Sequence, residues 1–241
     1  MNRDYDRAAD QLRPLAFQAD YQMHPAGSVL AVCGHTRVIC AVSVEKNVPG
    51  WMKAQEVPGG WVTAEYQMLP SATGTRSERE STKGRPNGRS AEIQRLVGRA
   101  LRAVVDLDKL PGLTLHIDCD VLDADGGTRC ASITGACAAV ERAVKRLLAD
   151  GTLAESPLKS RVAAVSVGIV DGVPLLDLDY KEDSAAQVDM NVVMTEEGRF
   201  VEIQGTGEEY AFDEAQLQQM LSLAKGGLRQ LFAEQARIAA L

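Results

Sequence analysis

The chain of 241 residues carries 26 Lys and Arg against 33 Asp and Glu, a formal charge of −7, and is 45 % hydrophobic. This composition supplies a full hydrophobic core, in one large domain or two small ones, and excludes a disordered chain. The acidic balance argues against a nucleic-acid binder whose whole surface is basic.

The first half of the chain predicts a hairpin, a long loop and a helix, in that order. Apolar residues alternate over 28–45 on both sides of Gly34-His35, which is typical of two strands joined by a tight turn. Residues 46–90 are rich in Pro, Gly and polar side chains, and only 61–66 has the pattern of a strand. A helix follows, capped by Ser90, with apolar residues at helical spacing on one face: Ile93, Leu96, Val97, Leu101 and Val104.

The second half continues with adjacent strands and two further helices. Residues 113–121 alternate as a strand, and a helix over about 133–148 ends at Gly151. The dipeptide Asp171-Gly172 is a strong hairpin signal between two of the next strands. These four strands are expected at 161–170, 173–180, 188–195 and 199–203.

The last helix, about 213–240, completes the predicted fold. Asp213 and Gln216 have the spacing of a capping box, and Gly226-Gly227 is expected to weaken or bend the middle of the helix. Strands that follow one another directly favour an α+β fold with mixed sheets and about three main helices. Because no low-complexity linker divides the chain, we expect a single domain over 1–241.

The termini, the longest apolar run and the cysteines indicate a cytoplasmic protein. Residues 1–7 are charged and no apolar stretch follows them, so we expect no secretory signal. The longest apolar run, about 162–170, is far shorter than the ~20 residues that span a bilayer. Five cysteines without a C-x-x-C pair predict reduced, mostly buried thiols: Cys33, Cys40, Cys119, Cys130 and Cys137.

Positive charge is concentrated in one part of this acidic chain. Residues 76–102 hold eight basic and three acidic side chains, a local charge of +5. A flexible arginine-bearing loop, about 70–90, leads into a helix with Arg95, Arg99 and Arg102 on one face. This arrangement suits a polyanion such as RNA, although a solvated, salt-bridged surface is an alternative.

Two further segments have residue types that suit phosphate chemistry. Gly126-Gly127-Thr128-Arg129 lies between a strand and a helix, where backbone amides, a hydroxyl and a guanidinium can bind an anion; an ordinary turn is the alternative. Asp183 and Asp189 can hold Mg²⁺ or serve as a general acid, with an acid-rich turn as the alternative. The aspartates at 118–125 do not fit a calcium loop, and the three histidines form no metal or catalytic motif.

Long segments in the same order resemble the ribonuclease PH family of bacterial phosphate-dependent 3′→5′ exoribonucleases, which trim tRNA precursors. The resemblance covers nearly the whole chain and is carried by residues 11–14, 61–66, 88–96, 118–122, 124–129, 163–168, 182–186, 189–195 and 204–206. It implies a fold similar to ribosomal protein S5 domain 2 and a homohexamer built as a trimer of dimers. It also implies tRNA nucleotidyltransferase activity, in either direction, on tRNA precursors and other structured RNA 3′ ends, with no DNA or membrane partner.

The resemblance also implies a role for each candidate residue. Inorganic phosphate, the co-substrate, is expected at Arg89, Gly127, Thr128 and Arg129. Asp183 and Asp189 are expected to act in catalysis and to bind Mg²⁺ or another divalent cation. Arg76 and Arg79 are expected to contact RNA.

Three departures from the family pattern lie outside those positions. Ser71 stands where an arginine is common, Asp6 stands where a glycine is common, and the loop over 55–60 is about two residues longer. A non-catalytic ring subunit that only threads RNA is the main alternative function. A small-molecule phosphotransferase is a weaker one, because it does not explain the arginine-bearing loop.

Overall fold

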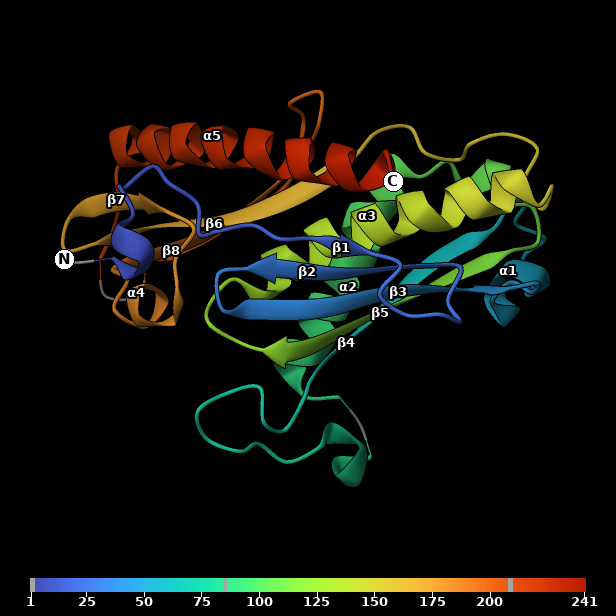
Figure 1. Ribbon diagram of the computed structural model, residues 1–241, viewed down its shortest axis with the longest axis horizontal. Coiled ribbons are helices and arrows are strands. Elements are labelled where there is room, and N and C mark those ends of the chain that lie inside the picture. Colours follow the sequence, from blue (N-terminus) through green and yellow to red (C-terminus); the bar gives the residue numbers. More distant parts are fainter. Residues whose placement is uncertain (1–2, 85, 208–209) are drawn as a thin grey trace.

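The computed structural model describes residues 3–84, 86–207 and 210–241, which form two sheets with three long helices (Figure 1). The first sheet has the order β1-β2-β3-β5-β4. Neighbouring strands in it are antiparallel except for β4 and β5, which are parallel. Its strands are β1 (Gln18–Ala19), β2 (Gly27–Cys33), β3 (Thr36–Glu45), β4 (Trp61–Met68) and β5 (Thr114–Asp123).

The second sheet is antiparallel throughout and has the order β7-β6-β8-β9. Its strands are β6 (Val162–Val170), β7 (Val173–Leu176), β8 (Val188–Thr195) and β9 (Phe200–Gly207). The long helices are α2 (Gly88–Val104), α3 (Thr128–Ala149) and α5 (Glu214–Ala239), and the short ones are α1 (Gly50–Ala54) and α4 (Tyr180–Ser184). Single 3₁₀ turns cover Asp4–Asp6, Glu80–Lys83 and Leu107–Lys109.

Two main hydrophobic clusters fill the space between these layers. The larger joins the first sheet to α2 and α3, and the smaller lies between the second sheet and α5. Helix α3 contacts strands of both sheets, so its first turn sits where the two sheets meet. The α+β prediction is therefore confirmed. Among the described helices, none has the length and apolar character needed to cross a membrane.

Two helices begin earlier than the sequence predicts, for local reasons. Helix α2 is capped by Asn87, whose side chain accepts a hydrogen bond from the Ser90 amide at 2.8 Å, so the assignment of Ser90 as the cap is wrong. Helix α3 begins at Thr128, five residues before the predicted start. Gly127 allows this because it adopts a left-handed conformation (φ 65°) directly before the helix.

Two predictions in the second half of the chain also need correction. The strand expected over 173–180 ends at Leu176, because Asp177 turns the backbone (φ 56°) and α4 follows with Asp179 as its cap. Helix α5 runs without interruption through Gly226-Gly227. A side chain on Gly227 would lie about 3 Å from Leu12 and Leu176, so this glycine serves close packing against the sheet. The Asp213–Gln216 capping box is confirmed.

Candidate functional site

The segment of residues 126–129, here called the glycine turn, brings backbone into close contact with α4. Gly126 and Gly127 have φ of 73° and 65°. A side chain on Gly126 would lie 2.6 Å from the carbonyl oxygen of Leu178 and 2.9 Å from the amide nitrogen of Tyr180. Both the backbone conformation and the lack of space therefore require glycine at this position.

A buried ion pair between Arg13 and Asp177 holds the glycine turn in place. The Arg13 guanidinium donates to both carboxylate oxygens of Asp177, at 2.7 and 3.1 Å, and to the backbone carbonyl of Asp125. Thr36 adds a hydrogen bond of 2.7 Å from its hydroxyl to the carbonyl of Gly126. Burial would raise the pKa of Asp177, but the charge and hydrogen bonds of Arg13 outweigh it and hold that pKa below its ordinary value. The pair is buried and ionised.

The hydroxyl of Tyr66 is the point at which the predicted phosphate ligands meet. It lies 2.8 Å from the hydroxyl of Thr128, the first residue of α3. Burial raises the pKa of Tyr66, whereas the hydrogen bond with Thr128 and the charges of Arg89 and Arg129 act to lower it. Arg89 and Tyr66 also line one cavity, together with Glu80 and Ser90. The structure brings together Arg89, Thr128 and Arg129, and adds Tyr66, which sequence reasoning placed only within a strand.

Arg129 ties three elements of the fold together at this point. Its Nη1 donates to the amide oxygen of Gln204 on β9 at 2.7 Å and to a carboxylate oxygen of Glu92 on α2 at 3.3 Å. Gln204 also donates to the same oxygen of Glu92, at 3.3 Å. The guanidinium is thus held beside Tyr66 by partners that are themselves partly exposed. An anion that enters the site competes with Glu92 for the same charge.

Asp189 faces the first turn of α3 from the second sheet. It lies on β8 between Gly168 of β6 and Thr206 of β9. Two residues further along the same face of β8, Asn191 accepts a hydrogen bond of 3.1 Å from the Cys130 thiol. Burial raises the pKa of the Cys130 thiol, while the charge of Arg129 acts to lower it and that of Asp189 to raise it. Asp189 therefore belongs to the same site as Thr128 and Arg129.

The acidic segment 182–183 divides into a buried and an exposed residue. Glu182 is buried and paired with Arg3 at 2.7 Å and Arg7 at 3.2 Å, so it supports the fold. Asp183 is exposed on α4, whose first amide, that of Tyr180, donates to the Asp125 carboxylate at 3.3 Å beside the glycine turn. Asp183 is thus an exposed residue of α4, whereas Asp189 is half-buried on β8.

Asp183 and Asp189 are the two carboxylates that the sequence predicts as metal ligands. In the parts of the chain that the structure describes, no three His, Cys, Asp or Glu side chains are grouped so that they could hold a metal ion. Carboxylates are nevertheless the protein ligands that Mg²⁺ prefers, and Mg²⁺ commonly keeps several waters and binds substrate phosphates. The donor types of Asp183 and Asp189 fit that ion.

The arginine loop, residues 69–84 and 86–87 in the structure, projects from the side of the molecule opposite α5 (Figure 1). Arg76 and Arg79 are exposed on it. Its start is fixed by Ala72, which is buried and accepts a hydrogen bond of 2.8 Å from the Ala124 amide. Its later part is fixed to α2 by Glu80, which accepts hydrogen bonds of 2.6 Å from Asn87 and from Ser90. Arg89 follows this loop as the second residue of α2. Arg85, part of the basic segment, falls outside the described residues.

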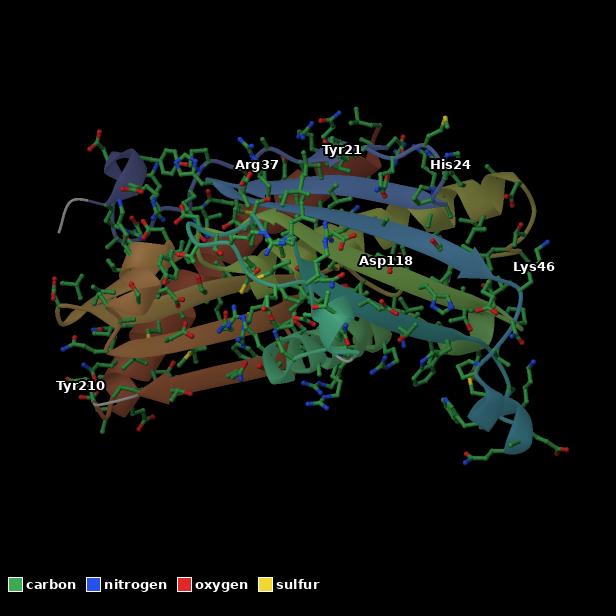
Figure 2. The ribbon with its side chains drawn as sticks, turned by 90° about the horizontal axis from the view of Figure 1, so that it is seen from below. Tyr21, His24, Arg37, Lys46, Asp118 and Tyr210 are labelled. Atoms are coloured by element: carbon green, nitrogen blue, oxygen red, sulfur yellow. The ribbon has the colours of Figure 1, made fainter. Side chains whose placement is uncertain are left out.

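The other histidines and aspartates considered in the sequence lie on the first sheet, in ion pairs or beside other carboxylates. Asp118 lies on the open face of the first sheet (Figure 2), and burial, followed by the charge of Glu65, raises its pKa. His116 is paired with Glu45 at 3.0 Å, and Asp123 with Arg37 at 3.3 Å, all on exposed positions. The aspartates at 118 and 120 stand on a strand, which agrees with the exclusion of a calcium loop.

Comparison with known proteins identifies the fold and the family model that this chain matches. Residues 11–145 match the model of domain 1 of the 3′ exoribonuclease family, and residues 160–227 match domain 2. The chain is similar to a structure of the Archaeoglobus fulgidus exosome with RNA bound to the active site, with 24 % identity and a TM-score of 0.81 over 97 % of this chain and 92 % of that one.

Two further solved structures are similar at lower TM-scores. Rice (Oryza sativa) Rrp46 has 18 % identity and a TM-score of 0.78 over 98 % of this chain and all of that one. A chain of an archaeal exosome core has 23 % identity and a TM-score of 0.76 over 95 % of this chain and 89 % of that one. At these identities the likeness shows the fold, which is the S5 domain 2-like α+β arrangement expected from the sequence.

Proposed function

The chain belongs to the 3′ exoribonuclease family, and we propose that it is a phosphate-dependent enzyme that shortens RNA from the 3′ end and releases nucleoside 5′-diphosphates. One observation carries the proposal. Tyr66 contacts Thr128 at the start of α3 and lines one cavity with Arg89. Arg129 follows Thr128, and Asp189 lies on the face of β8 from which Asn191 contacts the first turn of α3. The site therefore combines cationic and hydroxyl groups for an anion with a carboxylate that can move a proton.

The cationic groups of the site would reduce the repulsion between the two negative reactants. Inorganic phosphate and the terminal phosphodiester are both negative and repel one another. Arg89, Arg129, the Thr128 hydroxyl and the backbone amides at the glycine turn would bind and orient the phosphate, and each charge-assisted hydrogen bond contributes about 1.5–3 kcal/mol. The dipole of α3 adds to this attraction, because Thr128 is its first residue.

The carboxylate side serves the leaving group. Asp189 is our candidate for the general acid that protonates the departing 3′ oxygen, and the exposed Asp183 is the second acidic group. Mg²⁺ bound by these two residues would offset the charge on the reacting phosphoryl group. Run in reverse, the same groups would add nucleotides from nucleoside diphosphates.

The proposed substrates are tRNA precursors and other structured RNAs with a 3′ extension. The exposed arginines of the arginine loop suit the backbone of such an RNA. One similar structure is described as an exosome with RNA bound to its active site, which supports RNA as the substrate class. We further propose a homohexameric ring in the cytoplasm, an assembly that would gather the arginine loops of several subunits.

A direct assay tests the reaction. The protein is incubated with a 3′-extended tRNA, Mg²⁺ and labelled inorganic phosphate, with Asp189→Asn as the matched variant. We expect label in nucleoside diphosphates with the native chain and little with the variant. Release of nucleoside monophosphates without added phosphate would instead identify a hydrolase, and intact RNA under all conditions would identify a non-catalytic ring subunit.

A further inference from the structure

A cluster of two tryptophans and an arginine lies at the end of α2 remote from the glycine turn. The rings of Trp51, on α1, and Trp61, at the start of β4, meet edge to face with centroids 5.1 Å apart. The Arg102 guanidinium lies over the ring of Trp61, 4.8 Å from its centroid, and donates to the carbonyl of Val62 at 2.8 Å. Trp51 is 44 % exposed, so a large aromatic surface faces solvent beside a cation.

The fold makes room for this cluster at a cost to helix stability. Gly98 lies in the interior of α2, where glycine is about 1 kcal/mol less favourable than alanine. A side chain on Gly98 would lie 2.9 Å from the Arg102 guanidinium. Gly98 therefore leaves the space that Arg102 occupies above Trp61.

Helix α2 and strand β4 carry residues of both the tryptophan cluster and the candidate site. Arg89 and Arg102 are thirteen residues apart on α2, about 20 Å along the helix axis. On β4, Trp61 and Tyr66 are five residues apart, about 17 Å. At one end of both elements lies the Tyr66 hydroxyl, and at the other end lies the tryptophan cluster.

Positive side chains occupy the helix face between the two ends. Arg95 and Arg99 are exposed at intermediate positions of α2. Arg99 is paired with Glu202 at 2.5 Å, but an exposed pair of this kind contributes less than about 1 kcal/mol and leaves the arginine open to exchange. Cations spaced along a surface that ends in aromatic rings are the features that bind single-stranded nucleic acid, through phosphate contacts and base stacking.

We propose that Trp51, Trp61 and Arg102 form a stacking platform for a base of single-stranded RNA, upstream of the 3′ end that occupies the candidate site, with Arg95 and Arg99 contacting the phosphates between. This proposal rests on the proposed function for the direction of the strand. The platform itself requires only that RNA binds along this face of α2.

Trp51 and Trp61 are the only two tryptophans of the chain, which makes the proposal directly measurable. Tryptophan emission is recorded while an unstructured RNA oligonucleotide of about 12 nucleotides is added without phosphate, so that phosphorolysis cannot proceed. We expect saturable quenching by this oligonucleotide and little change with a dinucleotide, which fills the site but does not reach the platform. An unchanged emission at saturating RNA overturns the proposal.

Variants separate stacking from other effects. Stacking of one base on an aromatic ring is lost in Trp51→Ala, so we expect about fivefold weaker binding of the long oligonucleotide, with near-native affinity in Trp51→Phe. Phe200→Ala is the matched control, because Phe200 is 45 % exposed but lies under Lys225 of α5. Equal affinity of Trp51→Ala and the native chain overturns the platform.

The outcomes also separate this proposal from the proposed function. Quenching by RNA in a protein that releases no diphosphates supports the platform while contradicting phosphorolysis. Phosphorolysis with no change in tryptophan emission supports the proposed function and contradicts the platform. Emission that changes with protein concentration alone, and not with RNA, overturns the platform and assigns the cluster to contact with a second copy of the chain.

Discussion

The glycine turn and the arginine loop both carry residues suited to phosphate, but they are held in opposite ways. The glycine turn is fixed by a buried ion pair, backbone contacts without spare room, and hydrogen bonds from Arg13 and Thr36. The arginine loop is held at its start by the buried Ala72 and at its end by Glu80, and its arginines Arg76 and Arg79 are exposed between these two points. A group that positions a reacting atom requires a rigid support, whereas a group that attracts a flexible strand does not.

The strongest test of this contrast removes the support beneath the glycine turn. Arg13→Ala removes the main partner of the buried Asp177 carboxylate and leaves only Arg7, at 3.9 Å, so we expect a loss of about 3–5 kcal/mol in the free energy of unfolding. Denaturant unfolding measures this loss. Arg37→Ala, which breaks the exposed pair with Asp123, should cost less than about 1 kcal/mol. Similar losses in the two variants would contradict the buried pair as the support.

The next largest effect is a loss of activity in a variant of Arg129 that keeps its fold. Arg129→Ala removes two charge-assisted hydrogen bonds to phosphate, each about 1.5 kcal/mol, so we expect kcat/KM for phosphate to fall by about 150-fold. Its present partners, Glu92 and Gln204, are partly exposed, so stability should change little. Steady-state kinetics with varied phosphate provides the measurement, with Arg37→Ala as the control. Native kinetics in Arg129→Ala would remove this residue from phosphate binding.

The sequence predicted the elements that carry the glycine turn and the arginine loop, but not the long-range contacts that hold the glycine turn rigid. The period of apolar residues located the long helices, and the dipeptide Asp171-Gly172 located a hairpin, because those signals are local. Arg13 and Asp177 are 164 residues apart, and no local pattern links them. The role of Tyr66 in the site was not predicted for the same reason, because its hydroxyl contacts Thr128 only in the folded chain. The capping box at Asp179 and Glu182 was a local signal that indicates α4 and was missed.

The buried pair also predicts how stability depends on pH. The pKa of Asp177 is lower in the folded protein than in the unfolded chain, where it is about 3.9. The stability from this group is therefore present above that value and is lost as pH falls through the folded pKa. We expect a shallower loss of stability below about pH 4 in both Asp177→Asn and Arg13→Ala, measured by denaturant unfolding at several pH values. A native slope in either variant would contradict the pairing.

The smallest expected effect tests the other side of the contrast. Replacing both Arg76 and Arg79 with alanine removes two exposed charges from the arginine loop. Each lost phosphate contact should reduce the salt dependence of RNA binding by about 0.7 in the slope of log K against log salt. We expect KM for a long RNA to rise a few-fold while kcat and the KM for phosphate stay near native values. A fall in kcat would mean that the arginine loop positions the reacting groups, and the division between a rigid turn and a flexible loop would then be wrong.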